Sequence, residues 1–145
     1  MDEEKLIHFR FTAIHILSKK LEPLTKEGIP QEFTFQIKTE VKVQEQINVV
    51  IPHVMIQIMN DKTQKELAEF TVGCFFEIED FNNAIIKNEE GVYIIPQSLL
   101  GIILPVSIST VRGIIYSELR GTYLQNAIMP VVFVNEMKPD PSATT

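Results

Sequence analysis

The chain has 145 residues, of which 45% are hydrophobic and 22% are charged, and its formal net charge is −6. This length suits one domain with a sizeable core, and the composition is that of a globular protein rather than a disordered one. The acidic balance argues against a nucleic-acid-binding protein, which would carry a basic surface. The single cysteine excludes an intramolecular disulfide, and the acidic start MDEEKL lacks the features of a secretory signal. We therefore expect a cytoplasmic protein.

The first half of the chain shows the alternation of apolar and polar residues that is typical of β-strands. Residues 6–17 form the first such segment, in which the phase changes after Ala13 and predicts a bulge. Residues 18–30, SKKLEPLTKEGIP, contain charges, prolines and a glycine, which predict a connection. Further strands are expected at 33–44, 49–59 and 67–78. Four antiparallel strands in chain order, followed by helices, predict a meander within an α+β fold.

The second half predicts helices. Residues 95–103 suit a short helix opened by Pro96, and Pro105 suits the first turn of a main helix that ends at Gly121. We expect one domain over residues 1–137 and a frayed tail over residues 138–145. The 21 uncharged residues 91–111 are long enough to cross a bilayer, but their two prolines favour buried structure over a membrane span.

The main helix is predicted to have two buried faces. At 100° per residue, one arc is wholly apolar and should lie on the sheet. The opposite side has small residues at the spacing i, i+4 and i+8, which lets another backbone approach closely. We interpret this side as a contact with a second copy of the chain, and a serine-rich surface is the alternative. The sheet-facing arc comprises Ile108, Val111, Ile114, Ile115 and Leu119, and the predicted oligomer interface comprises Ser109, Arg112, Gly113, Tyr116 and Ser117.

No residue pattern points to catalysis. His8, His15 and His53 all fall in strand patterns, and no pair of them has the spacing of metal ligands. Cys74 has no second cysteine nearby and fits a small core residue. Nucleotide-binding and metalloprotease motifs are also lacking, so we expect no enzyme, no cofactor and no bound metal. The strands are instead more apolar than one helix layer can cover, which predicts self-association or a binding groove.

The segment RGTYLQNAIMPVVF resembles the one that follows the main helix in the SecB family of protein-export chaperones, typically RGTF-P-Q-L-N-L-A-PVNF. Tyr123 replaces an aromatic residue of that pattern. Upstream, FRFTAIHI and LAEFTVGCFFEI resemble two strands of the family, so the likeness covers residues 7–137. The residues that match the motif in the same spacing are Arg120, Gly121, Thr122, Gln125, Pro130, Val131 and Phe133.

The resemblance implies a four-stranded antiparallel sheet backed by helices and assembled as a dimer of dimers. It also implies an ATP-independent chaperone that holds unfolded preproteins and passes them to the SecA motor. Glu22, Leu67 and Glu69 match family positions that dock this motor, whereas Ser18 stands where an aspartate is usual. Typical members continue into another helix, but Pro139 and Pro141 prevent one here. The sequence therefore suggests a divergent SecB-like protein.

Two hypotheses about function follow. The first is a holdase that binds unfolded polypeptide, and the second is an adaptor or toxin–antitoxin-associated protein that binds one specific partner. For the first, the apolar face of the second strand supplies the predicted binding residues, although each of them would serve equally well as core. These residues are Phe33, Phe35, Ile37, Val41 and Val43.

Overall fold

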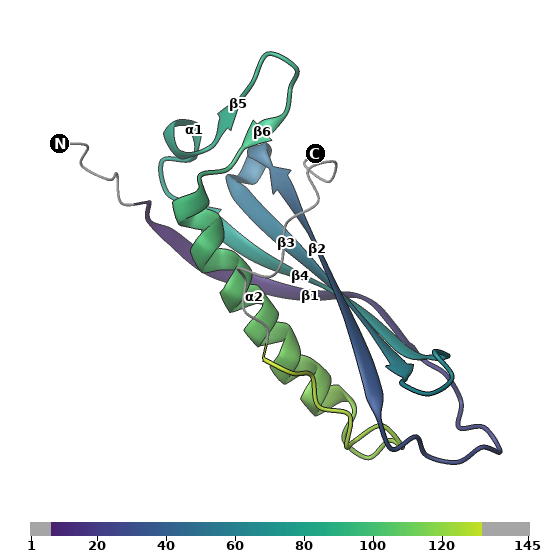
Figure 1. Ribbon diagram of the computed structural model, residues 1–145. Coiled ribbons are helices and arrows are strands. Elements are labelled where there is room, and N and C mark those ends of the chain that lie inside the picture. The colour runs from purple at the N-terminus through teal and green to yellow at the C-terminus, as the bar shows by residue number, and fades with distance from the viewer. Residues whose placement is uncertain (1–6, 132–145) are drawn as a thin grey trace.

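A four-stranded antiparallel sheet carries one long helix on one face (Figure 1). The computed structural model describes residues 7–131, so the predicted domain end at residue 137, the tail 138–145 and the motif residue Phe133 lie outside the described residues. The strands are β1 Phe9–Leu21, β2 Phe33–Gln44, β3 Val49–Asn60 and β4 Glu66–Ile78, and the helix is α2 Gln97–Glu118. Smaller elements are a 3-10 turn Glu45–Ile47, α1 Phe81–Ala84 and the hairpin β5 Ile86–Lys87 with β6 Tyr93–Ile94. The predicted α+β class and the four-stranded sheet are confirmed.

The strand order is β1-β4-β3-β2, which differs in part from the expected meander. Strands β2, β3 and β4 do follow one another, but β1 pairs with β4 instead of β2. The connection over residues 22–32 therefore passes from one edge of the sheet to the other. Alternation along a strand shows which face a residue occupies and not which strand lies beside it, so this order is not encoded in the sequence pattern.

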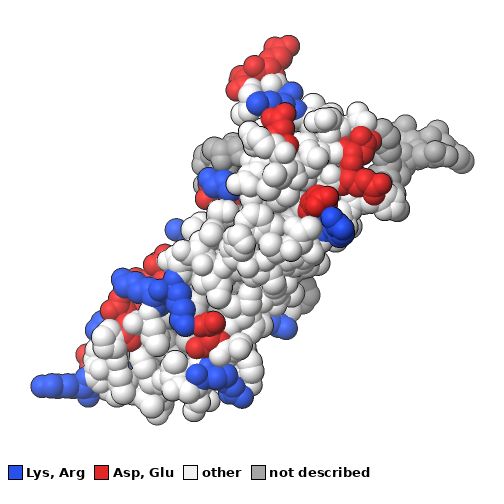
Figure 2. All heavy atoms as spheres, turned by 180° about the vertical axis from the view of Figure 1, so that it is seen from behind, with Lys and Arg blue, Asp and Glu red and all other residues white. Residues whose placement is uncertain are grey.

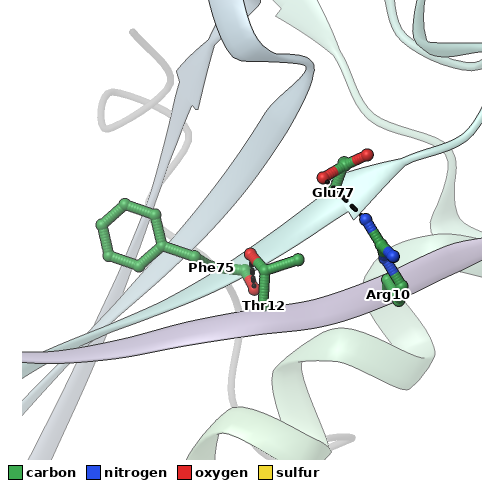
Figure 3. Close-up of polar contacts among 4 residues, drawn as sticks. All are labelled: Arg10, Thr12, Phe75 and Glu77. Atoms are coloured by element: carbon green, nitrogen blue, oxygen red, sulfur yellow. Dashed lines mark hydrogen bonds and ion pairs between the residues drawn. The ribbon is translucent and has the colours of Figure 1, made fainter.

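Strand β1 is bulged twice, once at Thr12 and once at Leu17, and the first bulge confirms the predicted change of phase. At the first bulge the hydroxyl of Thr12 donates a hydrogen bond to the carbonyl of Phe75 over 3.3 Å (Figure 3). Nearby, Arg10 forms an ion pair with Glu77 at 3.2 Å across the same strand pair. The strand also runs four residues beyond its predicted end, to Leu21, although that extension is charged.

One continuous helix replaces the two helices that were expected. Pro105 lies inside α2 and does not begin a new helix. A proline in a helix interior costs about 3 kcal/mol, partly because it removes one hydrogen bond. Leu99 and Ile103 before it, and Ile108 and Val111 after it, are all buried against the sheet. Burial on both sides of the proline offsets its cost and keeps the helix unbroken.

The core lies between α2 and the two central strands, β3 and β4. The prediction for the sheet-facing arc of the helix is confirmed, with Ile114 half-buried and the other four residues fully buried. Ser107 is the one buried polar residue of the helix, and its hydroxyl donates to the carbonyl of Ile103 over 2.7 Å. The strand side is dominated by Ile56, Ile58, Phe70 and Phe76.

By length and composition alone, α2 would be long and apolar enough to cross a membrane, with a mean hydropathy of 1.8 over its most apolar window. Among the described residues it is the one helix that meets this criterion. A core helix of a globular domain meets the same criterion. In the structure 39% of this window is buried, and α2 packs against β3 and β4.

Phe76 offers a direct test of this core. Its ring is buried and lies 4.6 Å from the ring of Phe11 and 5.8 Å from that of Phe9. We expect Phe76→Ala to lower the free energy of unfolding by about 3–5 kcal/mol, because it removes an aromatic side chain and leaves a cavity. Chemical denaturation measures this change. Ile86→Ala, at an exposed position of the β5–β6 hairpin, should change stability by less than about 0.5 kcal/mol.

A candidate polypeptide-binding surface

The helix covers only the middle of the sheet face on which it lies. An α-helix is about 10 Å wide with its side chains, whereas strands are spaced by about 4.8 Å. One helix can therefore cover about two strands, and α2 packs against β3 and β4. The helix-facing sides of the two edge strands, β1 and β2, remain partly open to solvent.

On β1 the open side carries four exposed apolar residues, which we call the β1 strip. Lys19, which forms an ion pair with Glu118 of α2, lies on the same side between the third and the fourth of them. Residues directly opposite each other in an antiparallel pair lie on the same face of the sheet. The β4 partners of these four residues have no exposed surface and lie in the core, so the strip faces the helix side. The strip consists of Phe11, Ile14, Ile16 and Leu21, which are 37%, 45%, 45% and 37% exposed.

On β2 the same face holds the five residues predicted to bind unfolded polypeptide. Val41 is 6% exposed and belongs to the core. The other four are half-buried and pack against the edge of the core, and we call them the β2 strip: Phe33, Phe35, Ile37 and Val43. The structure thus places the predicted residues on one face, with four of them partly accessible.

Both strips lie on edge strands. In the order β1-β4-β3-β2, the outer edges of β1 and β2 have no strand partner among residues 7–131. An extended peptide can add to such an edge by main-chain hydrogen bonds while its alternate side chains rest on the neighbouring apolar surface. The geometry is suited to binding extended polypeptide with little dependence on its sequence.

The solvent side of α2 forms one wall of a groove of about 570 Å³. Four of the five predicted interface residues line it, namely Ser109, Arg112, Gly113 and Tyr116. Ser117 is exposed nearby but does not line it. The opposite wall is the chain segment Ile128, Met129, Pro130 and Val131, which sequence patterns did not connect with this face. The face predicted to contact a second copy is therefore a groove and not a flat helix surface.

The three residues expected to dock a motor protein lie close together. The backbone N–H of Glu22 donates to the carbonyl of Leu67 over 2.8 Å. Glu69 lies one alternation further along β4, opposite Lys20, and Lys20 forms an ion pair with Glu22 at 3.0 Å. Leu67 itself is only 7% exposed. The three residues therefore lie together at one end of the β1–β4 pair, and the leucine presents little surface to a partner.

The sheet face away from α2 is uncharged in its middle, and charged side chains gather mainly towards its ends (Figure 2). Gly73 lies at the centre of this face. Side-chain atoms of Ile51, Leu17 and Phe75 lie 3.4, 3.5 and 3.6 Å from the position that a Cβ of Gly73 would occupy. These three side chains therefore close over the glycine and form a small apolar cluster.

Two of the histidines lie at the surface, and the cysteine lies in the core. His8 and His15 are exposed, and His15 lies 4.5 Å from the ring of Phe75. Cys74 is buried, as predicted, and burial raises the pKa of its thiol, which keeps it protonated and a weak nucleophile. Within residues 7–131 no group of three or more His, Cys, Asp or Glu residues could hold a metal ion.

The β1 strip is absent from the predicted site because the two bulges break its pattern. Phe11 and Ile14 are three residues apart because the first bulge lies between them, and Ile14 and Ile16 are two residues apart. The second bulge then lies between Ile16 and Leu21. A strict period of two assigns these residues to opposite faces of the sheet. The phase change after Ala13, together with the charge-free run from Phe11 to Leu17, is the sequence signal that could have identified it.

One solved structure provides a likeness at the level of the fold. It is the Mycobacterium tuberculosis SecB-like chaperone Rv1957 in complex with a ChAD peptide from the HigA1 antitoxin. The two chains share 10% sequence identity with a TM-score of 0.56, over 86% of this chain and 90% of the other. No protein-family model matches the sequence, and no curated protein matches it significantly. The chain therefore has the fold of a SecB-like chaperone.

His53 should make stability depend on pH. This residue is half-buried on the face away from α2, and burial lowers the pKa of its imidazole below the ordinary 6.5, helped by Lys42 and opposed by Glu40. Below pH 6.5 the unfolded chain therefore binds a proton at this position more readily than the folded chain. The free energy of unfolding should fall as the pH drops from 6.5 towards the lower folded pKa. Denaturant unfolding between pH 7.5 and pH 5 measures this loss, and His53→Gln should reduce its slope. An unchanged slope in that variant would contradict the assignment.

Proposed function

We propose that this protein is a SecB-like chaperone that holds unfolded polypeptides without ATP. The observation that carries the proposal is the β1 strip, a row of exposed apolar side chains beside a free strand edge. A folded globular domain rarely leaves such a row open unless another chain covers it. The β2 strip offers a second, shallower surface of the same kind.

The energetics suit a holding function. Completing the burial of a half-exposed isoleucine contributes about 1 kcal/mol, so the β1 strip contributes a few kcal/mol in all. Main-chain pairing along the strand edge adds to this, and the ordering of the bound chain opposes it. The opposing contributions favour weak, reversible binding, which permits both capture and release.

The fold likeness supports polypeptide binding in general terms. The Mycobacterium tuberculosis chaperone binds a peptide from an antitoxin, that is, a segment of one particular protein. This favours a second candidate function for the present chain, an adaptor dedicated to a single partner. Affinity capture distinguishes the two, because a holdase retains many unfolded chains and an adaptor retains one partner at a fixed stoichiometry.

Three further features belong to the proposal. The protein would act in the cytoplasm and assemble as a homo-oligomer, with the α2 groove as its contact, and a dimer of dimers is the expected assembly. Preproteins would be its natural clients. Transfer to a SecA motor would use the Glu22, Leu67 and Glu69 cluster, and the buried leucine together with Ser18 would make that contact weak.

Polar substitutions in the β1 strip test the function directly. Ile14→Ser combined with Ile16→Ser removes two half-exposed apolar side chains and should lower the free energy of unfolding by about 2 kcal/mol, because the buried half of each isoleucine is lost as well. We expect affinity for a fluorescently labelled, permanently unfolded polypeptide to fall about tenfold to thirtyfold, because about 1 kcal/mol of burial is lost at each position. Suppression of the aggregation of a denatured enzyme at stoichiometric amounts should weaken in parallel.

Leu17→Ser is the matched control for this experiment. Leu17 lies on the same strand and is 50% exposed, but it packs over Gly73 on the opposite face of the sheet. The Leu17→Ser variant should bind the unfolded polypeptide with the same affinity as the parent protein. A double variant that holds clients as well as the parent would show that the β1 strip is not the binding surface.

The groove contact between copies has its own test. A Cβ at Gly113 would meet no atom within 4 Å, so Gly113→Glu fits the single chain while placing a charged side chain in the groove. Replacing a helical glycine also favours the helix by about 0.5–1 kcal/mol. We expect this variant to have a lower oligomeric mass than the parent in light scattering after size exclusion, at unchanged or higher thermal stability.

Gly101→Glu serves as the control for the groove variant. Gly101 lies in the same helix, is exposed and has equally open surroundings, but it does not line the groove. Its variant should keep the mass of the parent. A parent protein that is monomeric at all accessible concentrations would overturn the oligomer proposal.

A further inference from the structure

The connection between β1 and β2 has more length than its path requires. Crossing from one edge of a four-stranded sheet to the other covers three inter-strand spacings, about 14 Å. Residues 22–32 could span roughly 36 Å when extended. Since length does not dictate the course of this segment, local contacts must fix it.

Side-chain packing does little to fix the course of residues 22–32. Within residues 22–32 only Glu22 and Pro30 are half-buried, and the remaining residues are exposed. Beneath the connection lies a pocket of about 20 Å³, lined by Leu24, Leu67 and Tyr123 among others. This volume is about that of one water molecule, so the connection does not close tightly onto the end of the sheet.

Hydrogen bonds supply the fixation instead, and one of them comes from a side chain beyond α2. The hydroxyl of Tyr123 donates to the backbone carbonyl of Glu22 over 2.6 Å, while the N–H of Glu22 donates to Leu67. The peptide groups flanking Glu22 are thereby held from two directions where the chain leaves β1. Burial raises the pKa of the Tyr123 phenol, so this group remains a donor at neutral pH. Figure 1 shows the segment that follows α2 at the same end of the molecule as this connection.

The connection also carries apolar side chains without cover. Leu24 and Ile29 are 50% and 59% exposed. In the chain they stand between Leu21, the last residue of the β1 strip, and Phe33, the first residue of the β2 strip. A connection on a fixed course presents these two side chains at a constant position between the end of β1 and the start of β2.

We propose that Tyr123 is a positioning residue for polypeptide binding, whose hydroxyl fixes the course of residues 22–32 so that Leu24 and Ile29 extend the binding surface around the end of the sheet. This inference rests on the proposed chaperone function and adds a specific group to it. Phenylalanine at this position would fill the same space as the tyrosine ring but could not hold the carbonyl of Glu22.

Tyr123→Phe is the variant that tests the proposal, because it removes one oxygen atom and keeps the ring. We expect affinity for a labelled unfolded polypeptide to fall about threefold to tenfold, the range that corresponds to one lost hydrogen bond. Trypsin cleavage after Lys26, identified by mass spectrometry, should become several-fold faster. Leu24→Ser with Ile29→Ser should lower the affinity in the parent background and have little further effect in the Tyr123→Phe background.

Tyr93→Phe is the matched control. The Tyr93 hydroxyl donates to Oε2 of Glu45 over 2.8 Å, away from the connection, so its loss should change neither cleavage after Lys26 nor affinity. A Tyr123→Phe variant that is cleaved faster but binds equally well would limit Tyr123 to a structural role and overturn this inference alone. A parent protein that binds no unfolded chain would overturn the proposed function and this inference with it.

Discussion

The structure depends on the burial of a single helix against a sheet that is twice as wide as the helix can cover. Helix α2 covers the apolar face of the two central strands, β3 and β4, and this contact forms the core of the domain. The same contact leaves the helix-facing sides of β1 and β2 without a second layer. A second helix over the edge strands would close the core, and none is present among residues 7–131. The two strips are therefore open because one helix covers only two of the four strands, and not because of a few individual side chains.

Much of this fold follows from sequence patterns, and the exceptions have specific physical causes. Strands β2, β3 and β4 agree with prediction to within one residue at each end, because polar turn residues separate these apolar segments from one another. Strand β1 was predicted to end too early, since Lys19 and Lys20 read as loop residues. In the structure these lysines form ion pairs with Glu118 and Glu22 while their backbone stays in the sheet. Pro105 was taken for a helix start because local propensity gives no measure of the packing on either side of it.

The accessibility of the β2 residues was predictable only in part. The regular alternation of β2 shows which residues share a face, but it does not show how far a distant helix covers that face. Val41 thus belongs to the core, whereas Phe33, at the start of the same strand and on the same face, is half-buried. The hydrogen bond from Tyr123 to Glu22 joins residues separated by 101 positions. Only the folded chain brings such a pair together, so no local pattern could reveal it.

The surfaces available for assembly and for polypeptide binding are physically distinct, which bears on how the two activities would combine. The groove on α2 is formed by the solvent side of the helix and residues 128–131, whereas both strips lie on the edge strands that the helix leaves uncovered. A copy of the chain docked in the groove would leave the strand edges free. A copy paired along the β1 edge would instead occupy the surface that an extended client needs. Self-association through the groove is therefore compatible with a holding function, and pairing along β1 would compete with it.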